Sequence, residues 1–138
     1  MIGFENEWRF RDYLDGRGNN IILEWSTGLP ATAQAKLDTI LLLLRVAQSF
    51  PPQYVSALRG YEGILELRIG SCGVQYRPLG CYGPDRKEFT LLIGAIEKGG
   101  KLPKADCETA VERRKTILKD RRRTCEHEFG QARHSREI

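Results

Sequence analysis

Three apolar runs in the middle of the chain are separated by two clusters of turn-forming residues. The runs cover 64–69, 74–77 and 89–96, and the clusters lie at 70–73 and 83–86. Glycine and Gly-Pro pairs are typical of tight turns, and short turns join strands that run in opposite directions. The pattern therefore predicts an antiparallel meander of three strands.

The positions where the turns close set the register of this meander. A first turn that closes symmetrically within 70–73 places Glu66 opposite Arg77. A second turn that closes within 82–87 places Arg77 opposite Leu92. Because side chains alternate between the faces of a sheet, the predicted core face carries Leu65, Leu67, Ile69, Val74, Tyr76, Leu91, Ile93 and Ala95. The opposite face carries Glu66, Arg68, Gln75, Arg77, Leu92, Gly94 and Ile96.

Two arginines and a glutamate thus share the face that lacks a core. Arg68 and Arg77, with Gly94 beside them, form a surface that suits an anion. The same arginines also suit an ordinary cross-strand ion pair with Glu66, of the kind found on any solvated sheet face. The residue pattern leaves both interpretations open.

Helical periodicity precedes the meander. An apolar stripe at the spacing of one helical face predicts a helix over 31–48, and Pro51 and Pro52 end it because proline lacks an amide donor. Asn19 or Asn20 is placed to cap a shorter helix before it. The stripe consists of Leu37, Ile40, Leu41, Leu44 and Ala47.

A strand and a helix flank these elements. Residues 7–14 alternate briefly and predict a first strand, whereas Pro103 opens a last helix over 104–123. Residues 53–62 are expected to be a connector with at most one helical turn. The order β-α-α-β-β-β-α predicts an α+β fold, with the first two helices packed on a small, mainly antiparallel sheet.

Composition indicates one globular domain. The chain has 138 residues, of which 41% are hydrophobic and 29% charged, so one core is expected. We assign residues 1–123 to this domain and 124–138 to a polar tail. The longest apolar run, 40–44, is too short to span a membrane, and the first residues lack the features of a signal peptide. We therefore expect a cytoplasmic protein without a membrane contact.

Four cysteines are spread along the chain, and a cytoplasmic protein keeps such cysteines as free thiols. Cys125, His127 and His134 provide three candidate metal ligands, but their spacing fits no standard zinc pattern. We therefore expect no metal site.

Basic residues are concentrated in one segment. The formal net charge of the chain is +4, and residues 98–123 hold 10 basic and 4 acidic side chains. Such a concentration is typical of a surface that binds a polyanion. A solvated helix face is the alternative interpretation.

The element order and several stretches resemble the RelE/HigB-like toxin superfamily, in particular its phage-derived HigB-type branch. The resemblance covers about residues 7–120 and rests on the order of its motifs. These motifs are the glycine turn 16–18, the tryptophan-ending helix 23–25, the strand 65–69, the Tyr-Arg pair 76–77, the basic loop 97–103 and the helical segment 110–115.

This resemblance implies the toxin of a type II toxin–antitoxin system, a metal-independent endoribonuclease without a cofactor. The implied partners are messenger RNA, often on the ribosome, and an antitoxin that carries a helix-turn-helix DNA-binding domain. In the implied reaction the RNA 2′-hydroxyl attacks the adjacent phosphate, giving a cyclic phosphate and a free 5′-hydroxyl. Arginine suits this chemistry because its guanidinium binds phosphate oxygens bidentately and stays charged.

The resemblance also assigns roles to individual residues. Arg77 matches the phosphate-binding arginine, and Arg68 matches a basic position on the preceding strand. Glu66 is a candidate base. The implied catalytic set is Arg77, Arg68, Glu66 and Lys98, and RNA contacts are expected from Lys101, Lys104, Arg113 and Arg114.

Two features depart from the family pattern. Glu97 replaces the first lysine of the basic loop, and residues 98–123 contain no Tyr, His, Phe or Trp that would stack on RNA or carry a proton. These departures favour an alternative function, a non-catalytic phage-derived module that binds nucleic acid or protein on the same fold. In a third interpretation, a partner covers Leu92 and Ile96 on the outer sheet face.

Overall fold

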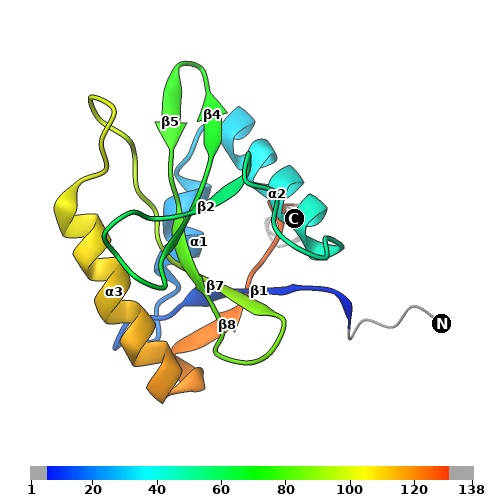
Figure 1. The fold of residues 1–138 in the computed structure, drawn as a ribbon, viewed down its shortest axis with the longest axis vertical. Coiled ribbons are helices and arrows are strands. Elements are labelled where there is room, and N and C mark those ends of the chain that lie inside the picture. Colours follow the sequence, from blue (N-terminus) through cyan, green and yellow to red (C-terminus); the bar gives the residue numbers. More distant parts are fainter. Residues whose placement is uncertain (1–5, 131–138) are drawn as a thin grey trace.

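The structure, a computed structural model, describes residues 6–130 (Figure 1). Its helices are α1 (Ile21–Thr27), α2 (Ala31–Arg45) and α3 (Lys104–Lys119), with a 3₁₀ turn at Arg121–Arg123. Its strands are β1 (Arg9–Tyr13), β2 (Val55–Ala57), β3 (Leu65–Leu67), β4 (Ile69–Ser71), β5 (Val74–Tyr76), β6 (Leu79–Tyr82), β7 (Glu88–Ile93) and β8 (Thr124–Glu126). Within this described range, no helix combines the length and apolarity needed to cross a bilayer.

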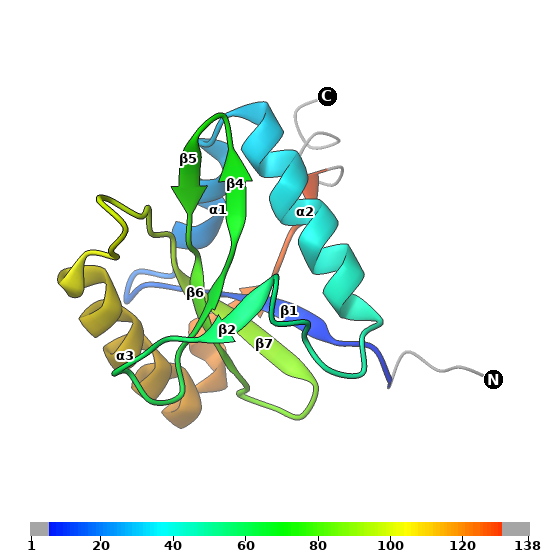
Figure 2. The same ribbon diagram turned by 45° about the horizontal axis from the view of Figure 1, so that its top comes forward.

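Six strands form one mixed sheet in the order β2-β3-β6-β7-β1-β8. Neighbouring strands within this sheet run antiparallel, except β1 and β7, which run parallel. Strands β4 and β5 form a separate hairpin that extends away from this sheet (Figure 2). The predicted α+β fold is confirmed, with more strands than the expected meander and first strand provide.

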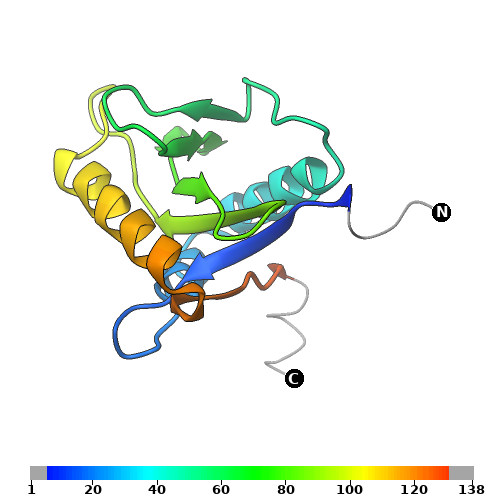
Figure 3. The ribbon, with the colours of Figure 1, turned by 60° about the horizontal axis from the view of Figure 1, so that its bottom comes forward.

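Helices cover both faces of the sheet. Leu91 of β7 packs in one buried cluster with Leu41 of α2, whereas its neighbour Leu92 packs in a second cluster with Ile117 of α3. Figures 1 and 3 show α2 and α3 on different sides of the central strands. The chain therefore has two cores, one on each face.

The second core corrects the prediction of an outer face that a partner would cover. Leu92 is 0% exposed because α3 packs directly on it. Ile96 is partly buried against the cluster that contains the α2 side chains. The sequence alone did not show that α3 returns to cover this face, so the third interpretation is wrong for Leu92.

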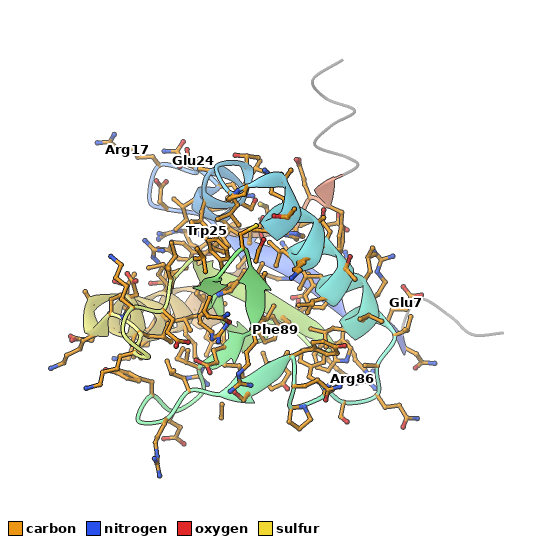
Figure 4. The ribbon with its side chains drawn as sticks, turned by 90° about the horizontal axis from the view of Figure 1, so that it is seen from above. Glu7, Arg17, Glu24, Trp25, Arg86 and Phe89 are labelled. Atoms are coloured by element: carbon orange, nitrogen blue, oxygen red, sulfur yellow. The ribbon has the colours of Figure 1, made fainter. Side chains whose placement is uncertain are left out.

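Local signals at α1 and α2 are confirmed with small changes at the ends. The side chain of Asn20 accepts a hydrogen bond from the amide of Leu23 (2.9 Å) and caps α1. Trp25 points toward the sheet (Figure 4), where it packs so closely on Gly94 that an added Cβ would lie 2.1 Å from its ring. Helix α2 ends at Arg45, whose carbonyl accepts the amide of Trp8 (2.8 Å).

The first hairpin closes one position later than predicted. Ser71 pairs with Val74, and the loop between them consists of Cys72 and Gly73, with φ values of 51° and 79°. A two-residue hairpin loop commonly needs positive φ at both positions, and glycine adopts it without strain. The predicted loop at residues 71–72 lacks glycine, whereas the observed loop at 72–73 contains Gly73. The predicted register is therefore wrong by two residues.

This shift changes the neighbours of the predicted site residues. Within the first hairpin each side chain keeps its predicted face, because the shift is even. In the last strand the prediction is wrong for Ile93 and Ala95, which pack in the second cluster with Leu92 because the pairing is irregular there. Glu66, however, lies opposite Leu79 and not opposite Arg77. Arg68, between β3 and β4, occupies the position opposite Arg77, between β5 and β6. This follows because the β3–β6 pairs and the β4–β5 pairs have the same register.

The second hairpin also closes later than predicted, with Tyr82 paired to Phe89. An irregularity at the start of β6 shifts the pairing once more. As a result, the amide of Arg77 donates to the carbonyl of Ala95 (2.8 Å), and its predicted position opposite Leu92 is wrong.

Two segments that were expected to be irregular form strands. Residues 55–57, within the predicted connector, form β2 and pair with β3. Residues 124–126, placed in the polar tail, form β8 and pair with β1, so the folded domain continues past residue 123. Helix α3 is shorter than predicted, because the side chain of Asp120 caps the 3₁₀ turn that follows it.

Candidate functional site

An open cleft of about 910 Å³ lies between β2, β3, the loop over 97–102 and the first turns of α3. This volume is within the range of ligand-binding sites. The structure brings four predicted site residues together in its lining: Glu66, Arg68, Lys101 and Lys104. Other polar residues of the lining are Ser56, Arg59, Tyr61 and Glu97.

The charge of the cleft is mixed with a positive excess. Its cationic side chains are Arg59, Arg68, Lys101 and Lys104, against the two carboxylates of Glu66 and Glu97. The lysines and Arg59 are exposed and free to reach a ligand, whereas the carboxylates are half-buried. Because the positive charges are spread over several exposed side chains, this surface suits a chain of phosphates better than a single anion.

Arg68 is held at the cleft by two acceptors. Its Nη1 donates to the carbonyl of Pro52 (2.9 Å), and its Nη2 donates to Oε1 of Glu66 (3.2 Å). The cross-strand pair expected between Glu66 and Arg77 is therefore replaced by a pair within one strand segment. The side chain of Arg68 remains 39% exposed, so part of the guanidinium faces solvent.

Arg77 lies behind the cleft instead of in its lining. Its Nη2 contacts Oε2 of Glu97 (3.2 Å) and donates to Oε1 of Gln75 (3.1 Å), and Nη1 donates to the carbonyl of Tyr76 (3.2 Å). Its side chain is only 11% exposed. Because Glu97 both lines the cleft and pairs with Arg77, a phosphate that reaches Arg77 from the cleft has to replace this carboxylate.

A glycine loop joins β7 to α3 (Figure 1). Lys98 and Lys101 exchange backbone hydrogen bonds (2.8 and 3.0 Å) around Gly99 and Gly100, which both have positive φ. This tight turn brings Lys101 into the cleft lining, while Lys98 is exposed and is absent from the described lining. The basic pair is therefore split between the cleft and the outside of the loop.

The predicted RNA-binding arginines of α3 point elsewhere. Arg113 donates to the carbonyl of Leu92 (2.9 Å) and lies 4.8 Å above the ring of Tyr13, and burial lowers its pKa. Arg114 packs against Gly63 and lines two smaller pockets. Neither arginine is part of the described cleft lining.

Much of the remaining basic segment serves the fold. Arg121 bonds the carboxylates of Asp85 (2.6 Å) and Glu88 (2.7 Å). Arg123 donates to the carbonyl of Leu14 (3.0 Å) and the hydroxyl of Tyr13 (2.7 Å). These internal contacts explain part of the charge concentration that the sequence suggested for a polyanion surface.

Two cleft residues were missed by sequence reasoning, and both come from the connector after β2. Arg59 is exposed, and Tyr61 is half-buried and places a phenol ring in the lining. A basic residue and an aromatic residue on either side of Gly60 are a weak signal, since no periodicity marks this segment. Tyr61 is thus an aromatic residue of the cleft lining that lies outside residues 98–123.

The described residues do not suggest a metal centre. Within residues 6–130, no group of three or more His, Cys, Asp or Glu side chains has the arrangement needed to hold a metal ion. His134, one of the candidate ligands, lies outside the described residues. The cleft can instead hold oxyanions through Arg68, Lys101 and Lys104.

Comparison with known protein families gives a match. The sequence model of the phage-derived Gp49-like proteins (DUF891) matches residues 24–115, which is two thirds of the chain. The matched range contains all eight residues that the sequence suggested for the site. A comparison with curated proteins finds no match.

Proposed function

The chain belongs to the family of phage-derived Gp49-like proteins, a family of the RelE/HigB-like toxin type, and from this premise we propose that it is an endoribonuclease toxin that cuts messenger RNA. The observation that carries the proposal is the cleft in which Arg68, Lys101 and Lys104 meet Glu66, with Arg77 directly behind. The proposed partner is an antitoxin, as is usual for this type of family.

The proposed reaction needs only groups of the chain and of the RNA. The 2′-oxygen attacks the adjacent phosphorus, the bond to the 5′-oxygen breaks, and the products are a cyclic phosphate and a 5′-hydroxyl. One proton leaves the 2′-hydroxyl and one reaches the 5′-oxygen. The protein has to position the backbone, neutralise charge on the phosphate oxygens and support both proton transfers.

Charge and position suggest the division of these tasks. Arg68 and, once Glu97 is displaced, Arg77 bind the scissile phosphate, because guanidinium groups match its oxygens bidentately. Lys101 and Lys104 hold neighbouring phosphates, with Lys98 at the outer side of the loop. Glu66 is the carboxylate proposed to accept the proton.

Tyr61 completes the proposed site. Its ring lies in the lining with Arg59 and Arg68, where a base next to the scissile phosphate can stack on it. Its hydroxyl is a donor for the departing 5′-oxygen. This assignment places the aromatic group on the connector after β2 and not on α3.

A second function is favoured by one observation, the ion pair between Glu97 and Arg77. If the pair persists when RNA is bound, the chain binds single-stranded RNA through its lysines without cutting it. Binding would then fall steeply with added salt, since it depends on displaced counterions.

Inducible expression in a bacterial host tests the proposal. Growth and messenger RNA 5′ ends are followed for the natural chain, for Arg77→Ala and for Arg86→Ala, a matched exposed arginine on the loop before β7 (Figure 4). We expect growth arrest and new 5′ ends inside coding regions, both lost only in Arg77→Ala. Circular dichroism checks that each variant is folded. Arrest without new 5′ ends, or cleavage that survives in folded Arg77→Ala, contradicts the proposal.

A further inference from the structure

The outer side of α2 exposes large apolar side chains. Among residues 6–130, five large hydrophobic side chains are exposed, and three of them lie in the last turn of α2 or directly after it. They are Leu42, Leu43 and Val46, with exposed fractions of 47%, 49% and 69%. The opposite side of the helix is buried through Leu41 and Leu44. Because α2 is apolar on both sides, its exposed side is a candidate contact surface.

A groove of about 370 Å³ lies on this side of α2, between the helix and β4. Figures 1 and 2 both show β4 beside α2. Ile40 and Leu43 form the apolar wall on the helix, and Tyr54 and Ile69 form the wall that faces it. The helix contributes residues between 35 and 43 to the lining, which corresponds to about 12 Å along its axis. A groove of this length and character fits the apolar side of another helix.

The charge of the groove is positive. Its described lining contains Lys36 and Arg68 and no acidic residue. Lys36 is exposed and donates to the carbonyl of Gly70, which uses one of the three hydrogens of its ammonium group. Glu66, the ion-pair partner of Arg68, lines the cleft and is absent from the described lining of the groove.

This charge distinguishes between two kinds of occupant. A second copy of the chain, related by a twofold axis on this face, would bring the same cations against each other. Like charges across an interface are unfavourable, whereas carboxylates of a partner would pair with Lys36 and Arg68. The charge of the groove therefore favours an acidic partner over a symmetric dimer.

We propose that this groove docks an amphipathic helix of a protein partner. Apolar side chains on one side of that helix pack on Leu43 and on the exposed end of α2. Acidic side chains beside them pair with Lys36 and Arg68, and such pairs are charge-assisted hydrogen bonds. The partner thus covers apolar surface that the described part of the chain leaves exposed.

Arg68 connects the groove to the cleft, because it lines both. Its Nη1 and Nη2 already donate to Pro52 and Glu66, and its side chain is 39% exposed. A carboxylate in the groove and a phosphate in the cleft therefore compete for one guanidinium. The docked helix should weaken RNA binding, a consequence that rests on the proposed nuclease, whereas the docking surface itself does not.

A display library of helical peptides of about 18 residues, long enough to form a helix, tests the docking surface on the full chain. Leucine is fixed along one side of each peptide, and the flanking positions are randomised among Glu, Lys and Gln. We expect the selection to enrich glutamate. Leu43→Ser and Lys36→Gln should each weaken binding of the selected peptide about tenfold. Leu118→Ser, at a similarly exposed leucine of α3, should bind the peptide like the natural chain.

Several results would overturn the docking surface. They are enrichment of lysine, the absence of any preference between charges, the absence of any enriched peptide, and binding that is unchanged in folded Leu43→Ser. Circular dichroism checks that the variants are folded. Analytical ultracentrifugation of the natural chain tests the other occupant: a dimer that Leu43→Ser dissociates assigns this face to a second copy and also overturns the proposal.

Competition with RNA tests the connection through Arg68. The selected peptide, at saturation, should raise the dissociation constant of a 2′-O-methyl RNA about tenfold, as expected for the loss of one charge-assisted contact, but not in Arg68→Gln. A peptide that binds without weakening RNA contradicts this connection. If the peptide binds and RNA does not, the proposed nuclease fails and the docking surface stands. If RNA binds and no peptide does, only the docking surface fails.

Discussion

Replacing Glu97 by glutamine removes one negative charge from the cleft and keeps the size of the side chain. In the natural chain Oε2 of Glu97 lies 3.2 Å from Nη2 of Arg77, and the two side chains are 27% and 11% exposed. A hydrogen bond between charged groups contributes about 1.5–3 kcal/mol, and partial exposure places this one at the lower end. RNA that uses Arg77 has to break this contact.

Glu97→Gln should therefore bind RNA more tightly by about 1.4 kcal/mol, which corresponds to roughly tenfold in the dissociation constant. The assay is fluorescence anisotropy with a 2′-O-methyl RNA, which cannot be cleaved because its attacking oxygen is blocked. The measurement is made at several salt concentrations, since phosphate contacts depend strongly on salt.

Glu62→Gln is the matched control. Glu62 is an exposed carboxylate of the connector that lines a different pocket, so its removal changes the net charge equally without touching Arg77. An equal gain in both variants would show a general charge effect. No gain in Glu97→Gln would refute the reasoning that this carboxylate competes with phosphate for Arg77.

Three further predictions concern the cleft, the second core and the thiols. Tyr61→Ala should weaken binding of the same RNA by about 1–3 kcal/mol while Tyr61→Phe does not, because stacking needs only the ring. Leu92→Ala should lower the free energy of unfolding by about 3 kcal/mol in urea titrations, whereas Leu118→Ala, at an exposed position, should cost far less. Burial raises the pKa of Cys81 to about 12, so at pH 8 iodoacetamide should label exposed Cys72 in the folded protein and Cys81 only after unfolding. Because the pKa of Cys81 is raised in the folded state, its ionisation favours the unfolded chain, so the free energy of unfolding should fall as pH rises above the ordinary thiol pKa toward that value.

The elements with strong local signals could be predicted from the sequence. The buried positions of α2 follow one helical face, and Asn20 caps α1 through its own side chain. Both features depend on residues close together in the chain. The overall α+β class followed from the order of such elements.

The pairing register could not be predicted with the same success. The first loop closes one position later than predicted, so the partner of each residue moves by two positions. An irregularity at the start of β6 adds a further shift to the second hairpin. The contact between Arg77 and Glu97 depends on the second hairpin, whose loop also closes later than predicted and whose pairing shifts at the start of β6. No periodic pattern in either strand carries that information.

The cleft shows the same limit for individual residues. The family resemblance pointed to Lys101 and Lys104, and both line the cleft. Tyr61 could not be predicted, because it comes from a segment without periodicity. Arg113 was expected to contact RNA, but its guanidinium donates to the carbonyl of Leu92. Composition does not show which arginines the fold itself uses.

The position of β1 has a consequence for the order in which the chain can fold during synthesis. This strand precedes the other described strands in the chain, but its two neighbours in the sheet are β7 and β8, and the second of these is among the last described segments. Until residues 124–126 have left the ribosome, β1 has an open edge, and Asp12 and Arg11 lack His127 and Thr124. Contacts between distant segments form late in folding. A ribosome therefore has to release nearly the whole described chain before this sheet is complete, which delays any activity that depends on the sheet until β8 has emerged.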